Sequence, residues 1–524
     1  MSSCGLPLET SEHASMALNS RPSPTSTVHG ANMSDVPPVS KLELNNRRHS
    51  EGDAPLRTGR NTSELAGRGT TIDDLPDELL LEIFSYFSFT ENIDVLQEVC
   101  PRWKILAQDS HLWLDKKYVV GYKTTEEEAI ATFSAVPQLR TVILDKDVSP
   151  GVLEALSASC PHLTTLEATY LQVLTYLEAD NLFAECKEIR TLTISDNSFD
   201  VDVRFFDALA RVADLRVLHL GVYLPQKTSF PLNLLADTCP HLCDLKLGSC
   251  GNICYQIRDA EYFVSTHRHV LERLSISWMS VEGRCIVPLL SACAETLCRL
   301  EVFDCNERTV EEATDMFATL GRVHSLRQLL LHVSDSKVRH LIPAVFENGG
   351  LPKLQQLSLS CLIADETTRA LVPLCPDLRE LELVSCEGHT DALFEPLCRL
   401  EKLEKLKINS CKCLGEYAMS HIAKLPALNT LEFRDLKFDK LKPSVDCILE
   451  ISGLRWLYLF ESDCWAIPFD KFPGRLVNLR VLEVDCCEGD QIALDRISAQ
   501  MPDLTVEGYL WEPFPRQYSQ NCFV

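Results

Sequence analysis

Apolar residues recur along most of the chain in the pattern Leu-x-x-Leu-x-Leu, with polar residues at many of the positions between them. Two clear copies run Leu242-x-x-Leu245-x-Leu247-x-x-Cys250 and Leu378-x-x-Leu381-x-Leu383-x-x-Cys386. Fifteen copies start between Leu139 and Leu504, and successive starts are 24 to 29 residues apart. The alternating Leu-x-Leu part predicts a short strand, and the apolar residues at helical spacing before the next copy predict a helix. Each copy is therefore predicted to be one strand and one helix.

This period and pattern resemble those of leucine-rich repeats. A single unit cannot bury its apolar face alone, so we expect neighbouring units to stack with their strands in one parallel sheet. The predicted fold class is α/β, with a horseshoe over residues 139–507 that has strands on its concave face and helices outside. The repeated Cys-Pro-x-Leu at Cys160, Cys239 and Cys375 resembles the cysteine-containing subclass of these repeats.

A different pattern precedes the repeats. Apolar residues at 75, 79, 80, 83, 84 and 87 have helical spacing, Pro76 suits a first turn, and Asp74 is a candidate N-cap. A second helix is expected from about Asn92, and Pro101 should break or restart it. Three short helices offer few buried positions, so part of their apolar surface is expected to be exposed and to bind a partner.

This segment resembles the F-box motif across its full length. The resemblance is carried by Leu75-Pro76-Asp77-Glu78-Leu79, Ile83-Phe84, Val99-Cys100-x-x-Trp103 and Leu112-Trp113. The sequence departs from the motif at Phe87, where Leu is usual, and at Thr90-Glu91-Asn92, where an Asp-Leu pair is usual.

The resemblance implies binding to a Skp-type adaptor and, through it, to a cullin-RING ubiquitin ligase. The implied adaptor-binding residues are Leu75, Pro76, Leu79, Ile83, Phe84, Val99, Cys100 and Trp103. The alternative is that the segment is only a helical cap on the repeats.

These patterns divide the chain into five regions. We expect a disordered Ser/Pro-rich tail at 1–70, the F-box at 71–118, a helical linker at 119–138, the repeats at 139–507 and a C-terminal tail or cap at 508–524. The last region is aromatic and Pro-rich, and it either seals the final repeat or enters the concave face.

Composition and charge limit the partners. The 524 residues include 75 Asp and Glu against 50 Lys and Arg, which gives a net charge of −25. Such a chain repels phosphate backbones and anionic lipids, so neither nucleic acid nor a membrane is an expected partner. The start lacks the basic and apolar parts of a signal peptide, and no apolar stretch approaches a membrane span. We therefore expect a cytoplasmic or nuclear protein whose 23 cysteines are reduced thiols.

No cofactor, metal or catalytic site is predicted. Candidate metal ligands are the pairs Cys411/Cys413 and Cys486/Cys487 and the segment His267-Arg268-His269. The thiols recur once per repeat instead of converging as zinc ligands do, so they are expected to be small buried groups beneath the turns. The sequence has no Gly-rich phosphate loop, nucleophile elbow or His-Glu-x-x-His helix, so we expect a non-catalytic protein.

Outward positions on the strands are the candidates for binding a substrate. They include Trp278, Phe303, Arg434, Tyr458 and Phe460, and aromatic and Arg side chains of this kind dominate protein interfaces. The alternative is that these rings pack sideways on neighbouring repeats. The acidic repeats would attract a basic patch on a substrate.

Together the two resemblances imply the substrate-recognition subunit of an SCF-type ubiquitin ligase. Such a subunit would hold a protein substrate on the concave face and promote its ubiquitination and degradation. The alternative function is a stoichiometric scaffold or inhibitor without ubiquitin transfer.

Overall fold

The structure is a computed structural model. It describes residues 72–169, 174–199, 203–222, 230–247, 256–277, 286–303, 309–333, 337–347, 349–360, 365–385, 393–411 and 414–511. Several predictions fall outside these ranges: the tail 1–70, Trp278, residues 512–524 of the C-terminal region, and the thiols Cys250, Cys386 and Cys413.

The first described part is a cluster of short helices. In chain order it contains η1 (Ile72–Asp74), α1 (Asp77–Ser85), the π-helical turn η2 (Glu91–Leu96), α2 (Gln97–Val99), α3 (Pro101–Ala107) and η3 (Ser110–Leu112). Helix α1 begins after Pro76, which is its N-cap, so the expected N-cap Asp74 is wrong. The reason is that a residue before proline is driven out of the helical region, which excludes Leu75 from α1. Pro101 restarts the helix as predicted, because extended Cys100 separates α2 from α3.

The rest of the described chain is built on a single parallel sheet. Its sixteen described strands pair in chain order from β1 to β16. They are β1 (Lys117–Val120), β2 (Thr141–Leu144), β3 (Thr165–Ala168), β4 (Thr191–Phe199), β5 (Val217–Val222), β6 (Asp244–Leu247), β7 (Arg273–Ser277), β8 (Arg299–Phe303), β9 (Gln328–His332), β10 (Gln356–Ser360), β11 (Glu380–Val384), β12 (Lys405–Asn409), β13 (Thr430–Arg434), β14 (Trp456–Phe460), β15 (Val481–Glu488) and β16 (Thr505–Trp511). Fourteen of the fifteen predicted repeat starts lie two residues before one of the strands β2–β15, and the last, Leu504, lies one residue before β16. The predicted fold class is confirmed.

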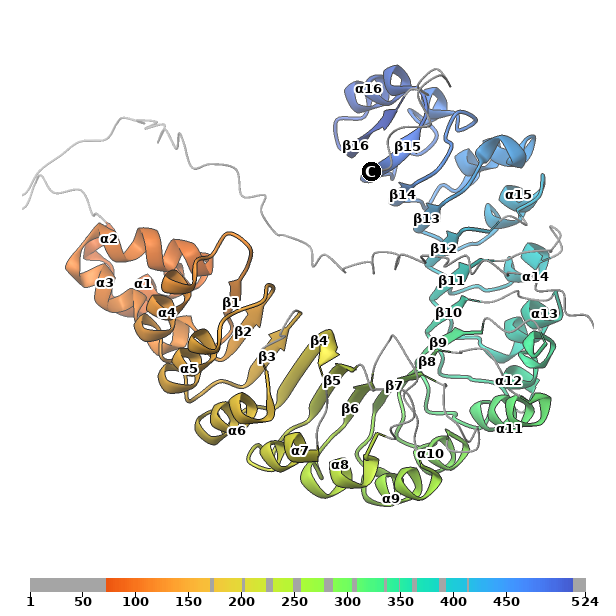
Figure 1. Cartoon of the computed structure of the whole chain (residues 1–524). Helices are drawn as coiled ribbons and strands as arrows, with labels where there is room; N and C mark the ends of the chain where they lie inside the picture. The colour runs from red at the N-terminus through yellow and green to blue at the C-terminus, as the bar shows by residue number, and fades with distance from the viewer. Residues whose placement is uncertain are drawn as a thin grey trace, which may run out of the picture. The chain divides into compact units, whose positions relative to one another are not determined.

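Helices and short helical turns join the strands. They are α4 (Glu126–Ala135), α5 (Pro150–Ser159), α6 (Tyr176–Glu185), α7 (Val203–Leu209), α8 (Leu232–Thr238), α9 (Ile257–His267), α10 (Ile286–Ala292), α11 (Val310–Leu320), η4 (Arg339–Leu341), α12 (Ala344–Glu347), α13 (Asp365–Leu374), α14 (Phe394–Leu397), α15 (Ala418–Ile422), η6 (Phe438–Leu441), η7 (Ser444–Glu450), η8 (Phe469–Lys471) and α16 (Gln491–Gln500). The strands line the inner side of a curved array and the helices cover its outer side (Figure 1). Within the described residues, no helix is both long and apolar enough to cross a bilayer.

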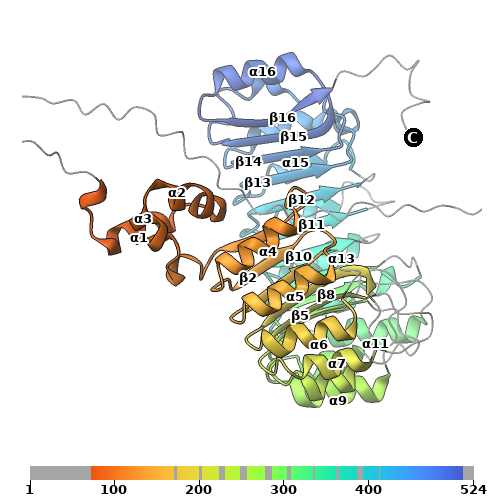
Figure 2. The same ribbon diagram turned by 60° about the vertical axis from the view of Figure 1, so that its left-hand side comes forward.

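The sheet begins earlier than predicted. The expected helical linker 119–138 holds the end of β1 and helix α4, because Tyr118 and Val120 are buried as the repeat leucines are, whereas Lys117 and Val119 are exposed. A series of ring contacts joins the first helices to the unit formed by β1 and α4. Measured between ring centroids, Phe89 lies 5.1 Å from Trp113 and 4.8 Å from Tyr118, and Tyr118 lies 5.7 Å from Phe133. These contacts give the F-box-like segment and the unit of β1 and α4 a common core. The helices α1–α3 lie at the β1 end of the array (Figures 1 and 2).

The cysteines of the Cys-Pro-x-Leu segments lie in the core, as predicted. Cys160, Cys239 and Cys375 are buried and unpaired. Burial raises the pKa of the Cys160 and Cys375 thiols to about 12 and that of Cys239 to about 11. These thiols act as small apolar groups under the turns.

The chain leaves the concave face in the same way after four successive strands. Ser385, Ser410, Asp435 and Glu461 follow β11–β14 and have φ between 49° and 54°. Each of these residues donates its backbone N–H to the carbonyl of the residue one position before its counterpart on the next strand, at 2.8–3.0 Å; the acceptors are Asn409, Arg434, Phe460 and Asp485. The left-handed turn sends the next described residue inward, so that Cys411, Leu436 and Ser462 are buried. The side chain before the turn is left on the concave face.

Candidate protein-binding surfaces

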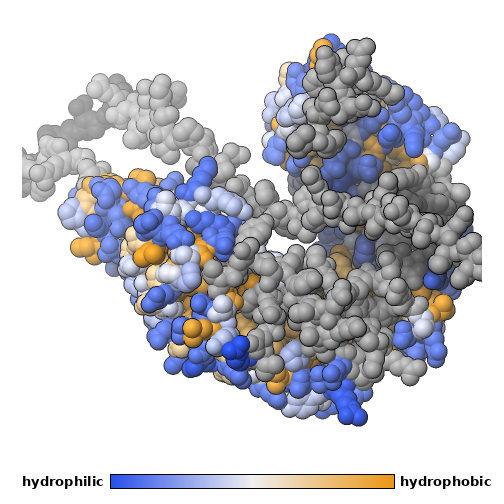
Figure 3. Space-filling view, viewed as in Figure 1, coloured by the Kyte–Doolittle hydropathy of each residue, from blue (hydrophilic) through white to orange (hydrophobic). Residues whose placement is uncertain are grey.

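The first candidate surface lies on the helices α1–α3. Leu79 of α1 is 46% exposed, Val99 of α2 is 53% exposed and Ile105 of α3 is 72% exposed. Apolar atoms lie among hydrophilic ones over this part of the molecule (Figure 3). Helix α3 contacts both α1 and α2, and exposed apolar side chains on neighbouring helices are suited to a protein partner.

The eight predicted adaptor-binding residues fall into three groups. Pro76, Leu79 and Val99 are exposed, whereas Leu75, Ile83, Cys100 and Trp103 are half-buried. Phe84 is wholly buried, so its predicted place on the exposed patch is corrected. Its ring packs edge-on against Trp103, with centroids 4.9 Å apart, and supports the surface from below.

Polar contacts hold this surface together. Arg102 Nη2 donates to the Leu75 carbonyl and to Asp77 Oδ1, both at 2.6 Å, which ties the start of α1 to α3. Buried Asn92 donates its amide to the carbonyls of Ser88 at 2.9 Å and Phe87 at 3.2 Å. Neither role was predicted from the sequence, although Asn92 stands at one of the positions that depart from the F-box motif.

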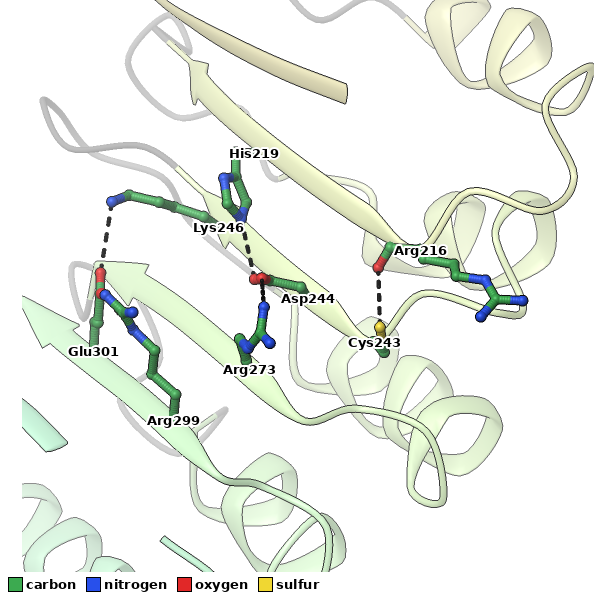
Figure 4. A network of polar contacts seen from close by, with 8 residues as sticks. All are labelled: Arg216, His219, Cys243, Asp244, Lys246, Arg273, Arg299 and Glu301. Atoms are coloured by element: carbon green, nitrogen blue, oxygen red, sulfur yellow. Dashed lines mark hydrogen bonds and ion pairs between the residues drawn. The ribbon is translucent and has the colours of Figure 1, made fainter. Parts of the chain in front are cut away.

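The second candidate surface is the concave face of the sheet. On β5–β8 its charges are paired: Asp244 lies between His219 Nε2 at 3.0 Å and Arg273 Nη1 at 3.1 Å, and Glu301 contacts Arg299 and lies 3.6 Å from Lys246 Nζ (Figure 4). Burial alone would raise the pKa of the Asp244 carboxyl, but its contacts with His219 and Arg273 outweigh burial and lower it. The charged side chains on this part of the face therefore neutralise one another.

The pairing continues on β10–β12. Glu380 Oε1 lies 3.1 Å from Lys407 Nζ and 3.6 Å from Lys405 Nζ, and Glu382 accepts a hydrogen bond from Ser358 at 2.8 Å. A hollow of about 170 Å³ lies over β8–β12, and its lining includes Glu380, Glu382 and Lys407. Both signs of charge line this hollow.

The last strands carry aromatic rings and carboxylates. Tyr458 and Phe460 of β14 lie 6.3 Å apart with an angle of 11° between their planes, and Arg434 of β13 lies 4.7 Å above the Phe460 ring. Arg434 also pairs with Glu461 at 3.0 Å. The rings are half-buried. One face of the Phe460 ring is covered by Arg434 of the neighbouring strand. For Phe460, the alternative that the ring packs sideways on a neighbouring repeat is therefore partly correct.

A row of acidic residues crosses the same strands. Glu432, Tyr458, Glu483 and Glu507 are in register on β13, β14, β15 and β16. Burial, followed by the charges of Glu507, Asp485 and Glu432, raises the pKa of the Glu483 carboxyl. Burial and the three carboxylates of the row likewise raise the pKa of Tyr458.

The structure thus brings together some of the predicted substrate-binding residues. Arg434, Tyr458 and Phe460 are neighbours, whereas Phe303 ends β8 and is five strands away from β13. Trp456 and Glu507 also face this side, and neither was predicted from the sequence to do so. The signal for Trp456 was its place two residues before Tyr458, because alternate residues of a strand share a face.

The candidate metal ligands have structural contacts. His267 is buried and stacked on Phe263, with Nδ1 3.0 Å from the Phe263 carbonyl and Nε2 2.8 Å from the Cys239 carbonyl. Within the described ranges, no group of three or more His, Cys, Asp or Glu side chains is arranged to hold a metal ion.

Comparisons with known proteins follow the two-part architecture. Residues 72–116 match the family model described as F-box-like. The chain is 32% identical over 115 residues to F-box/LRR-repeat protein 12 of Mus musculus and of Homo sapiens, and each match covers 18% of this chain and 32% of that protein. The chain thus spans about a third of the length of these relatives. Among solved structures it is similar to that of the yeast Rad7 and Elc1 complex, with 14% identity, a TM-score of 0.39, and coverage of 84% of this chain and 91% of that chain.

Proposed function

Since this chain, with its F-box-like domain ahead of leucine-rich repeats, belongs to the F-box/leucine-rich-repeat proteins, we propose that it is the substrate-recognition subunit of an SCF-type ubiquitin ligase. The F-box-like domain would bind a Skp-type adaptor and the repeats would bind a protein substrate. The observation that carries this proposal is the exposed apolar surface of Leu79, Val99 and Ile105 on that domain. Burying such side chains against a partner is favourable by about 1 kcal/mol or more each.

The role of the chain in this proposal is positioning. A substrate held on the concave face would have its lysines at a high effective concentration near the conjugating enzyme, which turns a bimolecular transfer into a nearly unimolecular one. The thioester chemistry would belong to other subunits, and the chain itself would be non-catalytic. We propose the cytoplasm or the nucleus as its place of action.

The second candidate is a scaffold or inhibitor that binds its partner without ubiquitin transfer. The F-box-like domain favours the ligase subunit, because a scaffold needs no adaptor surface. Depletion of the chain separates the two: the bound partner should accumulate if the chain directs its degradation and should keep its level if the chain only binds it.

The test is assembly of the full chain with purified Skp-type adaptor and cullin, followed by size-exclusion chromatography. Wild type should co-elute with both proteins, and Val99→Glu should elute alone, because it places a charge in the apolar interface. Val477→Glu is the matched control, since Val477 is also exposed, at 60%, but lies in the repeats. Co-elution of Val99→Glu as complete as that of wild type would refute the adaptor-binding surface, and an adaptor complex that takes up no cullin would favour the scaffold.

A further inference from the structure

Ion pairing divides the concave face into two parts. On β6–β11 the carboxylates Asp244, Glu301, Glu380 and Glu382 each have a cationic or hydroxyl partner. On β13–β16, Glu432, Glu483 and Glu507 have no ion pair with the part of the chain that the structure describes, although Lys407 of β12 stands opposite Glu432 and is influenced by its charge. Next to Glu483 in the row stand only Tyr458 and Glu507. The second part therefore has an excess of negative charge that the protein itself leaves unneutralised.

The strand register concentrates this charge. Glu483 and Glu507 are directly opposite each other on neighbouring strands, about 4.8 Å apart along the sheet. Like charges in opposed positions on adjacent strands destabilise a sheet. The raised pKa of Glu483 is the consequence of burial and of this crowding. A cation placed over the row would relieve the repulsion that folding creates.

Aromatic rings lie within the same row. Tyr458 lies between Glu432 and Glu483, and its ring is nearly parallel to that of Phe460. The protein already places one guanidinium on this stack, because Arg434 lies 4.7 Å above the Phe460 ring. Cations over aromatic faces are attracted by the ring quadrupole, and nearby carboxylates add a Coulomb attraction. Tyr458 is therefore suited to a second cation, one that comes from outside.

We propose that the concave face of β13–β16 binds a basic segment of a protein partner, whose lysine or arginine side chains contact Tyr458 and the carboxylates of Glu432, Glu483 and Glu507. Charge complementarity selects this occupant, because the row repels anionic partners. The row spans three strand spacings, about 14 Å, which is the length of roughly four extended residues. The inference rests on the proposed function in one respect only: the bound segment would belong to the ligase substrate.

The test is binding of a fluorescein-labelled peptide of five Gly-Lys repeats to the full chain, followed by fluorescence anisotropy. A peptide of five Gly-Glu repeats is the control ligand. The double substitution Glu483→Gln/Glu507→Gln should weaken binding of the lysine peptide about tenfold. Tyr458→Ala should weaken it several-fold through loss of the ring.

The control variant is Glu167→Gln. It makes the same charge change as the single substitution Glu483→Gln on the same face of the sheet, but on β3, which is far along the array from β15. It should change the peptide affinity less than twofold. Equal weakening by Glu167→Gln and Glu483→Gln would show that only net charge matters and would overturn the proposal, as would equal binding of the lysine and glutamate peptides by wild type.

Thermal unfolding provides an independent check. Because the folded state disfavours the ionised form of Glu483, Glu483→Gln should raise the unfolding temperature at pH 7 while it weakens peptide binding. A residue that opposes folding but favours binding is expected at a site. A lowered unfolding temperature together with weakened binding would instead indicate structural damage and would count against the assignment.

Failure of this inference and failure of the proposed function give different results. If the chain binds the adaptor but not the lysine peptide, only the basic-segment site is refuted. If it binds the peptide but not the adaptor, the ligase role is refuted and the site remains.

Discussion

Burial divides the apolar residues of the F-box-like domain into two classes. Substitution of the exposed class should weaken adaptor binding, and substitution of the buried class should lower the stability of the domain. Leu79 and Val99 are about half exposed, whereas Phe84 is fully buried. Full burial of a side chain of this size is worth about 1.5–3 kcal/mol, and a partner can bury only the exposed half. Leu79→Ala/Val99→Ala should therefore cost about 2 kcal/mol of adaptor binding, which is roughly a thirtyfold loss of affinity.

The same double variant should fold almost normally, because much of the truncated surface faces solvent. Phe84→Ala should instead destabilise the domain by about 3–5 kcal/mol, since it leaves a cavity beside Trp103. Isothermal titration of the full chain with purified adaptor measures the first effect, and thermal melting followed by circular dichroism measures the second. If Leu79→Ala/Val99→Ala kept its affinity within twofold of wild type at an unchanged melting temperature, these helices would not be the adaptor-binding surface.

Three further predictions concern the repeats. The pKa of Asp244 is lowered in the folded state, so the stability it contributes is present above pH 4 and is lost as the pH falls through that lowered pKa. Asp244→Asn should therefore lower the unfolding free energy from urea titrations by about 1 kcal/mol at pH 7 and by less at pH 3; an equal loss at both pH values would contradict this. Gly508 has a φ of 84°, and a Cβ there would lie 1.7 Å from the Val484 carbonyl oxygen, so Gly508→Ala should speed amide hydrogen exchange in β16 and leave β2–β5 unchanged. Unaltered amide hydrogen exchange in β16 of this variant would show that the fold does not require glycine at position 508. Cys375 is buried, which raises its pKa to about 12, whereas Cys486 is exposed although burial and Asp485 raise its pKa too. Iodoacetamide at pH 8 should therefore modify Cys486 but not Cys375 until urea is added, and equal labelling of the folded chain, measured by peptide mass spectrometry, would refute this.

The leucine-rich-repeat pattern was sufficient to predict the position of nearly every described strand. It failed at β1, where Lys117-Tyr118-Val119-Val120 has no preceding Leu-x-x-Leu and where the exposed Val119 is apolar, so that the sequence shows no polar–apolar alternation. Four residues are too few for periodicity to decide, and the burial of Tyr118 depends on Phe89 and Phe133, which are distant in sequence. A terminal unit differs in sequence from the interior units because its neighbour on one side is a different structure.

The candidate sites were predictable only in part. Helix α1 is apolar at Leu79, Leu80, Leu81, Ile83 and Phe84, so its sequence cannot tell which side faces the core. Packing of Phe84 against Trp103 of α3 determines which side of α1 is buried. The sequence predicts which strand residues point outward on the concave face. Which of their charges form pairs depends on the register between neighbouring strands. That register separates the neutralised carboxylates from the unneutralised ones.

The pairing of every described strand with its chain neighbours gives the array a fixed scale of length. Twelve strand spacings lie between β1, which shares a core with the F-box-like domain, and β13, where the acidic row begins. At about 4.8 Å each, they measure roughly 58 Å along the sheet. Removal of one repeat would shorten that path by about 5 Å without changing any residue of either surface. The number of repeats therefore sets the distance between the two surfaces. In the ligase role that we propose, deletion of one repeat would change which lysines of a bound partner reach the transferring enzyme while leaving the affinity for that partner intact.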